Sequence, residues 1–306
     1  MIQPATPAQQ TEALRSEAAE LDLLAPEAAL TLLADSQAAA ARAVRDAVPA
    51  LALAAEAVAG ALGGDGRLIY AAAGSSGLMA LADALELPGT FGIAPARIRV
   101  LLAGGTQALF DLPGAPEDDE KQGAHEISEA AIGPNDCVIA LAASGSTPYA
   151  LGALREAKRR GARTIGLSNN PGTPILAEAD IPVLLATAPE VVAGSTRMGA
   201  GTAQKIALNM VSTLAAVKLG HVHGPFMVNM RADNAKLRDR AARMVAAIAG
   251  IDESQARALL DRSGGRVKHA VLLAAGAPDE AQAEALLVEH QNNLRAALRA
   301  LEESAL

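Results

Sequence analysis

Three short turns in this chain combine glycine with hydroxyl side chains: AAGSSG (72–77), AASGST (142–147) and AGSTR (193–197). Glycine lets backbone N–H groups approach an anion closely, hydroxyls add further donors, and a helix that follows such a turn adds positive potential from its free N–H groups. Three such turns predict a pocket for an anion of the size of a sugar phosphate. The alternative is that these residues occupy ordinary loops between strands and helices.

The third turn is followed by a long apolar segment, 201–220, with the pattern of a helix. Either an anion docks at the start of this helix, or the glycines only let the loop pass close to its neighbours. Arg197 is suited to a ligand's phosphate or carboxylate, or to an acidic neighbour in the chain. The candidate substrate-binding residues of the three turns are Ser75, Ser76, Ser144, Gly145, Ser146, Thr147, Ser195, Thr196 and Arg197.

Two glutamates are candidates for acid–base catalysis. Glu86 precedes a Pro-Gly turn in DALELPGTFG, where it either projects into a site or forms, with Asp83, the polar edge of a helix. Glu117 belongs to the acidic stretch PGAPEDDEKQG, which is a solvated loop unless Glu117 points inward. In that second case the charges of Asp118 and Asp119 raise the pKa of Glu117 and make it a better base.

Histidine and cysteine usage predicts no metal site. His221 and His223 are two positions apart in GHVHG, without a cysteine or a third ligand, which disfavours a metal ion. His223 could instead assist the opening of a sugar ring. Cys137 is the single cysteine, which excludes an internal disulfide, and we interpret it as a small buried hydrophobic residue in a protein of the reducing cytoplasm.

Short apolar runs that end in turn residues indicate the elements that position these groups. Runs without alternation are typical of strands buried on both faces, as in a parallel sheet covered by helices. Helical segments such as SGLMALADALEL separate several runs. We therefore expect an α/β fold, a doubly wound five-stranded parallel sheet of the flavodoxin-like kind, with ligands at the carboxyl ends of the strands. The expected strands are 67–74, 96–105, 136–145, 162–170 and 179–187.

The segments outside the sheet are expected to be helical. Apolar residues recur at intervals of three to four between about residues 28 and 62, and the last part of the chain contains short amphipathic stretches broken by Ser-Gly-Gly and Gly-Ala-Pro. We expect an N-terminal helical arm (1–55), a sugar-phosphate-binding domain (56–238) and a small C-terminal helical subdomain (239–306). A subdomain of that size packs on the main body or on a second subunit.

Composition excludes several classes of partner. The chain of 306 residues is 51% hydrophobic and only 2% aromatic, so its core is built from Ala, Leu, Val and Ile. A formal charge of -8 with scattered basic residues excludes a nucleic-acid surface. The apolar segment AVPALALAAEAVAGAL carries Pro49 and Glu56 and is interpreted as a buried helix, not a membrane span. The N-terminal residues do not resemble a secretion signal, which again indicates the cytoplasm.

Several motifs of the chain, in their order and spacing, resemble those of N-acetylmuramic acid 6-phosphate etherases. This family has the sugar isomerase (SIS) fold and is related to glucokinase regulatory protein. The resemblance runs from about Thr11 into the C-terminal helices, and its most specific part is the block from PEVVAGSTR to AGTAQK. The motifs are GRLIYAAAGSSG, DALELPGTFG, LLAGG followed by GAPEDD, IALAASGSTPY, SNNPG, PEVVAGSTRMGAGTAQKIALNMVST and NAKLRDRAARM.

The resemblance implies a carbon–oxygen lyase that cleaves the D-lactyl ether of N-acetylmuramic acid 6-phosphate by elimination and then hydration. By position, Glu117 matches the family's base at C2 of the ring-opened sugar and Glu86 matches its acid at the lactate oxygen. The three turns match the family's substrate-binding turns, and the start of the long helix would face the bound substrate. No metal or redox cofactor is implied, because the C1 aldehyde of the sugar is the electron sink.

Four positions depart from the family pattern. Leu78 and Ser146 stand where the family usually has arginines, and Asn169 and Gly199 stand where it usually has a cysteine and a lysine. A hydrogen bond to a charged group contributes about 1.5–3 kcal/mol, so these changes could weaken or redirect recognition of phosphate or lactate.

Two other functions are compatible with the same residues. One is an aldose–ketose isomerase that uses Glu117 as its base, and the other is a non-catalytic phosphosugar sensor, as glucokinase regulatory protein is. The presence of both Glu86 and Glu117 favours chemistry over sensing. By resemblance we also expect a homodimer with sites near the subunit interface.

Overall fold

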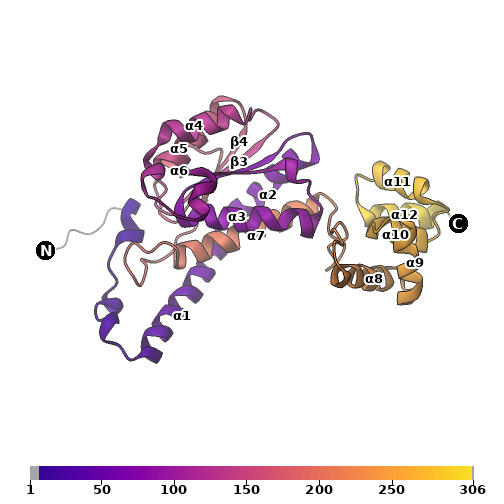
Figure 1. Ribbon diagram of the computed structural model, residues 1–306, viewed down its shortest axis with the longest axis horizontal. Helices are drawn as coiled ribbons and strands as arrows, with labels where there is room; N and C mark the ends of the chain where they lie inside the picture. Colours follow the sequence, from indigo (N-terminus) through magenta and orange to yellow (C-terminus); the bar gives the residue numbers. More distant parts are fainter. Residues whose placement is uncertain (1–6, 305–306) are drawn as a thin grey trace. The chain divides into compact units, whose positions relative to one another are not determined.

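The computed structural model describes residues 7–304 and contains one five-stranded parallel sheet (Figure 1). The strand order is β2-β1-β3-β4-β5, which confirms the doubly wound α/β fold. Every residue of β1 and β3 is buried, as expected of continuous apolar runs. All five expected strands are present: β1 (Leu68–Ala72), β2 (Ile98–Leu102), β3 (Cys137–Ala142), β4 (Arg163–Ser168) and β5 (Ile181–Leu184).

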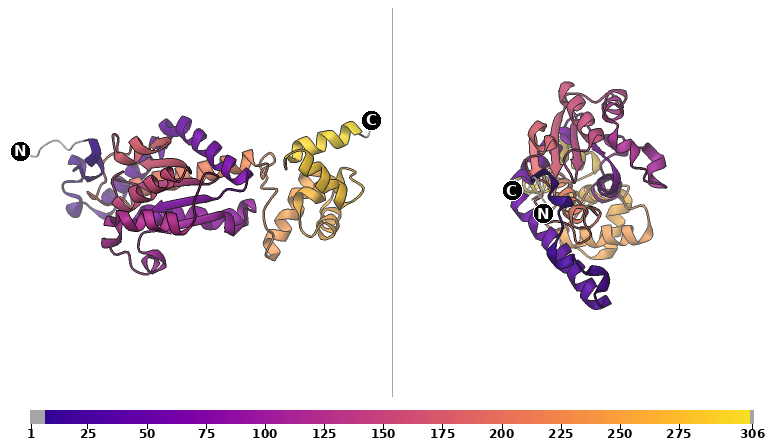
Figure 2. Two further views of the ribbon diagram at one scale, coloured as in Figure 1. Left: turned by 90° about the horizontal axis from the view of Figure 1, so that it is seen from above. Right: turned by 90° about the vertical axis from the view of Figure 1, so that its left-hand side faces the viewer.

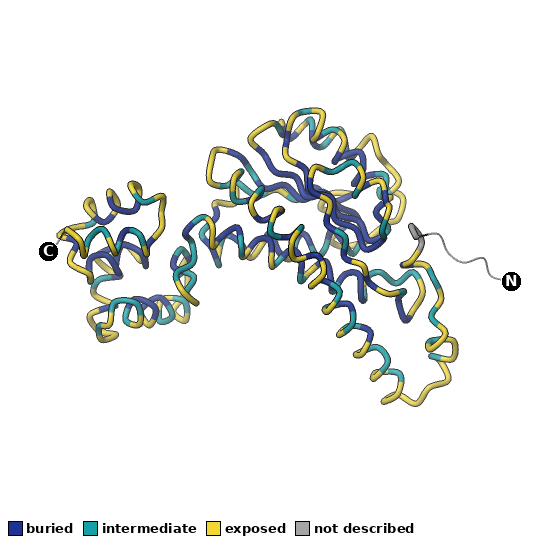
Figure 3. The backbone as a smooth tube through the Cα atoms, turned by 180° about the vertical axis from the view of Figure 1, so that it is seen from behind, coloured by how far each residue is buried: buried dark blue, intermediate teal, exposed yellow. Residues whose placement is uncertain are grey.

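Helices cover both faces of the sheet (Figure 1). One face carries α4 (Glu120–Glu129), α5 (Pro148–Arg159) and the short α6 (Pro174–Glu178), and its core includes Ile69 and Ala71 of β1. The other face carries α2 (Val48–Gly63), α3 (Gly74–Phe91) and α7 (Gly199–Lys218). Alternate side chains of β1 thus enter two apolar layers, and the sheet forms the buried centre of its part of the molecule (Figure 3).

A buried carboxylate ties the second face together. Asp83 of α3 is 3% exposed and accepts hydrogen bonds from Tyr70 Oη of β1 (2.6 Å), Asn209 Nδ2 (2.6 Å) and Ser212 Oγ (2.9 Å) of α7. Replacing a single partner would leave a buried charge under-satisfied. The network therefore fixes α3, whose first turn carries Ser75 and Ser76, against β1.

The N-terminal helices differ in how much of their surface is buried. In α1 (Pro26–Ala43) only Ser36 and Ala40 are buried, and the helix extends beyond the layers of the sheet (Figures 1 and 2). The stretch 26–63 is long and apolar enough to cross a membrane by length and composition. However, α2 packs against β1, β3 and β5, as the expected buried helix does.

The chain divides into two compact units, and the division falls within α3 and α7. One unit combines the chain up to Ala84 with Ala96–Ser212, and the other combines Leu85–Pro95 with the chain from Thr213 onward. The expected N-terminal arm falls inside the first unit, and the expected boundary at residue 238 falls inside the second. The second unit has its own apolar core and contains α8 (Ala235–Ala249), α9 (Glu253–Arg262), α10 (Val267–Ala274), α11 (Glu280–Glu289) and α12 (Leu294–Ser304).

Candidate active site

The carboxyl ends of β1 and β3 lie where the strand order reverses. Ala72 at the end of β1 pairs with Leu102 of β2 on one side and with Leu141 of β3 on the other. From this point β2 extends the sheet in one direction and β3 to β5 extend it in the other. Ligands of doubly wound sheets bind at such a position. The turns that follow β1 and β3 are two of the three turns singled out in the sequence.

Gly74 begins α3 in a left-handed conformation, with φ of +53°. The first hydrogen bond at this end joins Gly77 N–H to Ala73 O (3.1 Å), so the N–H groups of residues 74–76 precede the hydrogen-bond ladder of the helix. Ser75 is half-buried and Ser76 is buried. Within residues 7–304 neither hydroxyl has a protein hydrogen-bond partner. This helix start presents free donors, as an anion site requires.

Glu117 lies against the same helix start. It belongs to the 3-10 turn η7 (Ala115–Asp118), which packs against α5. A Cβ atom at Gly74 would lie 2.7 Å from Glu117 Oε1, so the carboxylate can approach only a glycine this closely. The geometry corresponds to the inward alternative for Glu117, not to a solvated loop.

The surroundings of the Glu117 carboxylate favour its neutral form. The side chain is half-buried and has no hydrogen bond or ion pair in the described part of the chain. Burial, and secondarily the charge of Asp118, raise its pKa above the ordinary value. Asp119, which we also expected to act on Glu117, instead accepts a hydrogen bond from Gln122 N–H (2.9 Å) and caps α4. Glu117 is therefore a carboxylate available for proton transfer.

The turn after β3 places two hydroxyls close together ahead of α5. Ser144 Oγ and Thr147 Oγ1 are 3.4 Å apart, and Ser146 N–H donates to Ser144 Oγ (3.3 Å) while the Ser146 side chain is exposed. Gly145 has φ of +71°, and a Cβ there would lie 2.3 Å from Thr173 Oγ1. Gly145 is thus needed for close approach to the loop after β4.

The third turn differs from the first two. Ser195 and Thr196 are half-buried, and Arg197 is exposed. The backbone N–H groups at the start of α7, those of Gly199 and Ala200, donate to Glu190 Oε2 (2.9 Å) and Oε1 (2.8 Å). The expectation that this helix start faces a bound substrate is therefore wrong for these two groups, because a carboxylate of the chain itself already occupies them.

Glu190 is a structural residue that the sequence analysis missed. It lies nine positions before Gly199 and is 2% exposed. The sequence does offer a signal for this role: Glu190 is a lone carboxylate after Pro189, in an otherwise apolar stretch that leads to a helix start, where a negative charge is stabilising.

The N-terminal segment closes over the third turn. Thr11 N–H donates to Asn170 Oδ1 (3.1 Å), Asn170 Nδ2 donates to Thr11 Oγ1 (3.0 Å), and Gly194 N–H donates to Thr11 O (3.3 Å). A Cβ at Gly194, where φ is +74°, would lie 2.8 Å from Glu12 Oε2. Thr11 and Asn170 thus connect the loop after β4 with the third turn inside one chain.

Glu86 lies on α3 within the second unit, and its side chain is exposed. It has no hydrogen bond or ion pair with any other residue between 7 and 304. The structure therefore gathers Glu117 with the first two turns, links the third turn to them through the loop after β4, and leaves Glu86 as an open carboxylate.

Two of the four departures from the family pattern have structural roles. Asn169 is fully buried, donates through Nδ2 to Leu185 O (3.2 Å) and Thr187 Oγ1 (3.3 Å), and accepts from Gln204 Nε2 (3.0 Å). Gly199 is part of the Glu190 cap, where a Cβ would lie 3.2 Å from Glu190 Oε2. Leu78 in the first turn of α3 is half-buried, and Ser146 is exposed.

Comparison with known proteins identifies the family. SIS domains match residues 33–169 and 120–219. An N-acetylmuramic acid 6-phosphate etherase of Deinococcus radiodurans is 48% identical over 280 residues, which span 90% of this chain and 92% of that relative. The chain belongs to the N-acetylmuramic acid 6-phosphate etherase family. Two further etherases support this assignment. The one from Rubrobacter xylanophilus is 44% identical over 89% of this chain and 91% of the relative, and the one from Symbiobacterium thermophilum is 42% identical over 86% of this chain and 87% of the relative.

In this member of the etherase family, residues 7–304 hold no group of three or more His, Cys, Asp or Glu side chains that could bind a metal ion. Cys137 is buried and burial raises its pKa to about 12, so it behaves as a hydrophobic residue. His223 forms a backbone bridge with Phe226, and burial and Arg295 lower its pKa. A neutral imidazole is the form that can accept a proton.

Proposed function

We propose that this protein cleaves the D-lactyl ether of N-acetylmuramic acid 6-phosphate, giving N-acetylglucosamine 6-phosphate and D-lactate. The observation that carries the proposal is the unbonded, half-buried carboxylate of Glu117 against Gly74, at a helix start whose donors are free. Family membership over nine-tenths of the chain supports the same reaction. The reaction serves the recycling of cell-wall amino sugars in the cytoplasm.

Glu117 acts as the base in the first half of the reaction. In the ring-opened sugar the C1 aldehyde acidifies the proton at C2, and the Glu117 carboxylate removes it, leaving the electron pair delocalised onto the aldehyde oxygen. Burial and Asp118 raise the pKa of Glu117, which brings its basicity closer to the acidity of such a carbon. Its half-burial also keeps part of the bulk water away from the reacting carbon.

Glu86 acts as the acid for the leaving group. The electron pair returns to form the C2–C3 double bond, the C3–O bond breaks, and the protonated Glu86 carboxyl gives its proton to the departing lactate oxygen. The ionised Glu86 then takes a proton from water, whose oxygen adds to C3 of the unsaturated aldehyde, while the protonated Glu117 returns its proton to C2. This cycle restores both carboxyl groups to their starting forms.

The substrate's phosphate and hydroxyls are held by the glycine and hydroxyl turns. The open start of α3, with Ser75 and Ser76, supplies backbone N–H groups and hydroxyls to an anion. Ser144 and Thr147 supply paired hydroxyls, and Ser195, Thr196 and Arg197 supply the remaining donors. An exposed Arg197 without an ion pair among the described residues is free to reach an anion.

The active assembly is a homodimer with its sites near the subunit interface. The apolar side chains of Leu85, Met210 and Val217 are exposed on α3 and α7, as side chains that a second copy buries would be. Light scattering together with activity measurements tests this, and a fully active monomer would contradict it.

The test of the reaction is incubation with N-acetylmuramic acid 6-phosphate followed by assay of lactate. Lactate and N-acetylglucosamine 6-phosphate in equal amounts are expected. An isomerised product without lactate would instead indicate an isomerase, and tight binding without turnover would indicate a sensor. In deuterated water, Glu86→Gln should still exchange the C2 hydrogen while it blocks lactate release; loss of exchange in this variant would reverse the assigned roles.

A further inference from the structure

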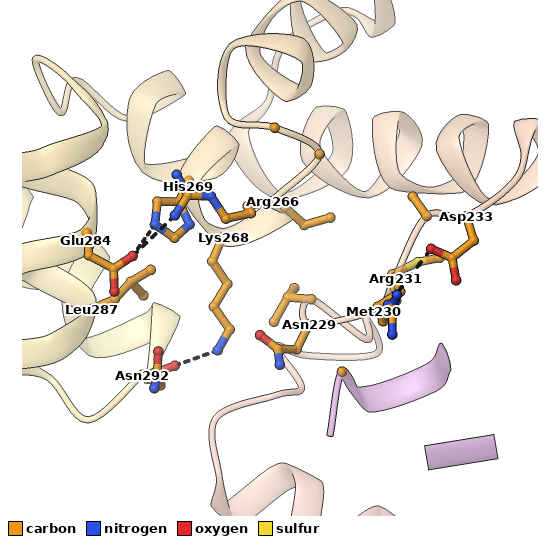
Figure 4. A pocket seen from close by; sticks show the side chains of 16 residues that line it. Asn229, Met230, Arg231, Asp233, Arg266, Lys268, His269, Glu284, Leu287 and Asn292 are labelled. Carbon is orange, nitrogen blue, oxygen red and sulfur yellow. Dashed lines mark hydrogen bonds and ion pairs between the residues drawn. The ribbon is translucent and has the colours of Figure 1, made fainter. Parts of the chain in front are cut away.

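A cavity of about 410 Å³ lies within the second unit, walled by the loop before α8 and by residues of α10 and α11 (Figure 4). None of the residues assigned above to the sugar site lines it. Its volume is in the range of small-molecule sites. The residues that decide its chemistry are Arg231, Gly265, Arg266, Lys268, His269 and Asn292.

Lys268 brings a buried positive charge to this cavity. The residue is 4% exposed, and its ammonium group points into the cavity between Asn292 and Asn229 (Figure 4). One of its three donors bonds to the backbone oxygen of Asn292 (3.0 Å). Among the described residues no carboxylate forms an ion pair with it. Two donors and the charge therefore lack a protein partner, a costly state for a buried ammonium.

The pKa values of Lys268 and of its neighbour His221 are both lowered, in the first place by burial. Burial lowers the pKa of Lys268 to about 8, opposed secondarily by the charge of Glu284, so the group remains mostly protonated at neutral pH. Burial and the charge of Lys268 together lower the pKa of His221 to about 4. The charge of Lys268 is thus felt by a neighbouring residue and is not neutralised locally.

Some of the other charged side chains of the cavity already form ion pairs within the protein, and others do not. Arg266 pairs with Glu280 and Glu284, and His269 Nε2 lies 2.7 Å from Glu284 Oε2. Those two carboxylates are therefore already in use. Arg231 has only a long contact with Asp233 (3.9 Å), and both side chains are more than half exposed. Such a surface pair is weak, so Arg231 is available to a ligand.

The start of α10 adds backbone donors to the same cavity. The helix follows Gly264 and Gly265, whose φ values are +60° and +81°, and its N-cap residue makes no capping hydrogen bond. The first backbone bond of the helix joins Ala270 N–H to Arg266 O (3.0 Å). The N–H groups of residues 267–269 donate to no acceptor among the described residues. These residues line the cavity.

We propose that this cavity binds a phosphate monoester, held by the ammonium of Lys268, the guanidinium of Arg231 and the free N–H groups at the start of α10. A phosphate monoester at neutral pH carries close to two negative charges and offers three acceptor oxygens. Two available cations and several backbone donors in the lining of one cavity match that dianion better than they match a carboxylate. The volume beyond the phosphate accommodates a substituent such as a sugar.

Calorimetry on the full chain tests the proposal in the Glu117→Gln background, where turnover is blocked and binding can be measured alone. Inorganic phosphate and N-acetylglucosamine 6-phosphate are titrated into this protein and into the same protein with Lys268→Gln. Because the sugar site also holds phosphate, two binding events are expected in the parent. Lys268→Gln should weaken one of them about tenfold or more, because one charge-assisted contact is lost, and should leave the other unchanged. Lys236→Gln, at an exposed lysine of α8 outside the cavity, is the matched control and should bind as the parent does.

Arg231→Gln guards against a folding defect at the buried Lys268. This side chain is exposed, so the variant should keep the parent's melting temperature and still weaken phosphate binding. For the binding event that these variants weaken, inorganic phosphate that binds as tightly as the sugar phosphate identifies free phosphate as the ligand. Tighter sugar phosphate in that same event shows that the substituent fills the cavity. Unchanged affinity for both probes in Lys268→Gln and Arg231→Gln would overturn the proposal. The lactate assay of the parent protein is independent of this outcome.

Discussion

Two helices begin in the first unit at glycine turns of similar composition, but the carboxylates near these two helix starts differ in their hydrogen bonding. At the start of α7, Glu190 is buried and accepts two backbone N–H groups at 2.9 and 2.8 Å. At the start of α3, the Glu117 carboxylate approaches Gly74 but forms no hydrogen bond among the described residues, and burial raises its pKa. One carboxylate is a cap, whereas the other is free to exchange a proton.

The difference shows what a glycine–serine turn does and does not encode. Such a turn predicts a helix start with affinity for an anion, and at α7 the Glu190 carboxylate occupies that position. It does not say whose anion binds. At α7 the protein supplies Glu190 from nine positions upstream, whereas at α3 the donors remain open for a ligand. Replacing each of the two carboxylates in turn should therefore separate an effect on stability from an effect on catalysis.

Glu117→Gln should have the largest effect on activity. Loss of a general base lowers the turnover rate by roughly 10³-fold. The fold should not suffer: because the folded-state pKa of Glu117 is raised, its ionised form opposes folding at neutral pH, and a neutral amide removes that cost. Lactate release and thermal unfolding at pH 7 measure the two quantities. A drop in melting temperature alongside the lost activity would mean that Glu117 is a structural cap after all.

Glu190→Ala should show the reverse pattern. Two buried hydrogen bonds to a charged group disappear, which should cost about 3 kcal/mol of unfolding free energy. Activity per folded molecule should fall far less than in Glu117→Gln. Urea unfolding monitored by circular dichroism measures the loss, and Glu190→Gln, which keeps one acceptor oxygen, should lie between the parent and the alanine variant. Equal stability of all three proteins would remove the distinction between the two helix starts.

Gly74→Ala tests the close approach of Glu117 to α3. The new Cβ would lie 2.7 Å from Glu117 Oε1 and must displace the carboxylate, so the turnover rate should fall roughly 10- to 100-fold. Gly105→Ala is the control, because that glycine also has a positive φ of +63° but has nothing within 4 Å of a new Cβ. It should cost about 1 kcal/mol of stability and leave the turnover rate unchanged. Equal rates in the two variants would assign the effect to backbone strain alone.

Asp118→Asn should have the smallest effect, on the pH profile alone. Glu117 must be ionised to act, and burial and Asp118 both raise its pKa, so activity is lost on acidification earlier than for an ordinary glutamate. Removing the charge of Asp118 moves this acid limb to lower pH, while the larger contribution of burial remains. Asp119→Asn is the control, since Asp119 caps α4 and should leave the limb in place. If the acid limb of the pH profile is unchanged in Asp118→Asn, the raised pKa of Glu117 is due to burial alone.

The sheet could be predicted from the sequence because its strands are local signals. Runs such as LIYAA and CVIALA are apolar at every position and end at turn residues, and each forms a fully buried strand. The inward position of Glu117 could be stated only as one of two alternatives. Its outcome depends on Gly74, which lies on another strand's turn, and no local pattern connects the two.

The differences between the structure and the expectations from the sequence have the same origin. Occupation of the α7 start by Glu190 depends on how an irregular stretch folds back, which periodicity does not describe. The expected boundary at residue 238 followed a change of pattern, whereas the compact units divide within two continuous helices. Asn169 and Gly199 were interpreted as departures in ligand recognition because their buried partners are distant in sequence.

The clasp between Thr11 and the loops that carry Asn170 and Gly194 has a consequence for the order of assembly. Its two side-chain bonds join residues 159 positions apart. During synthesis Thr11 leaves the ribosome 159 positions before Asn170, so its partners do not yet exist when it emerges. Loop closure over such a span carries an entropic cost that only an already formed sheet can offset. The third turn is therefore completed after the sheet, so a nascent chain forms its hydrophobic core before Thr11 closes this turn.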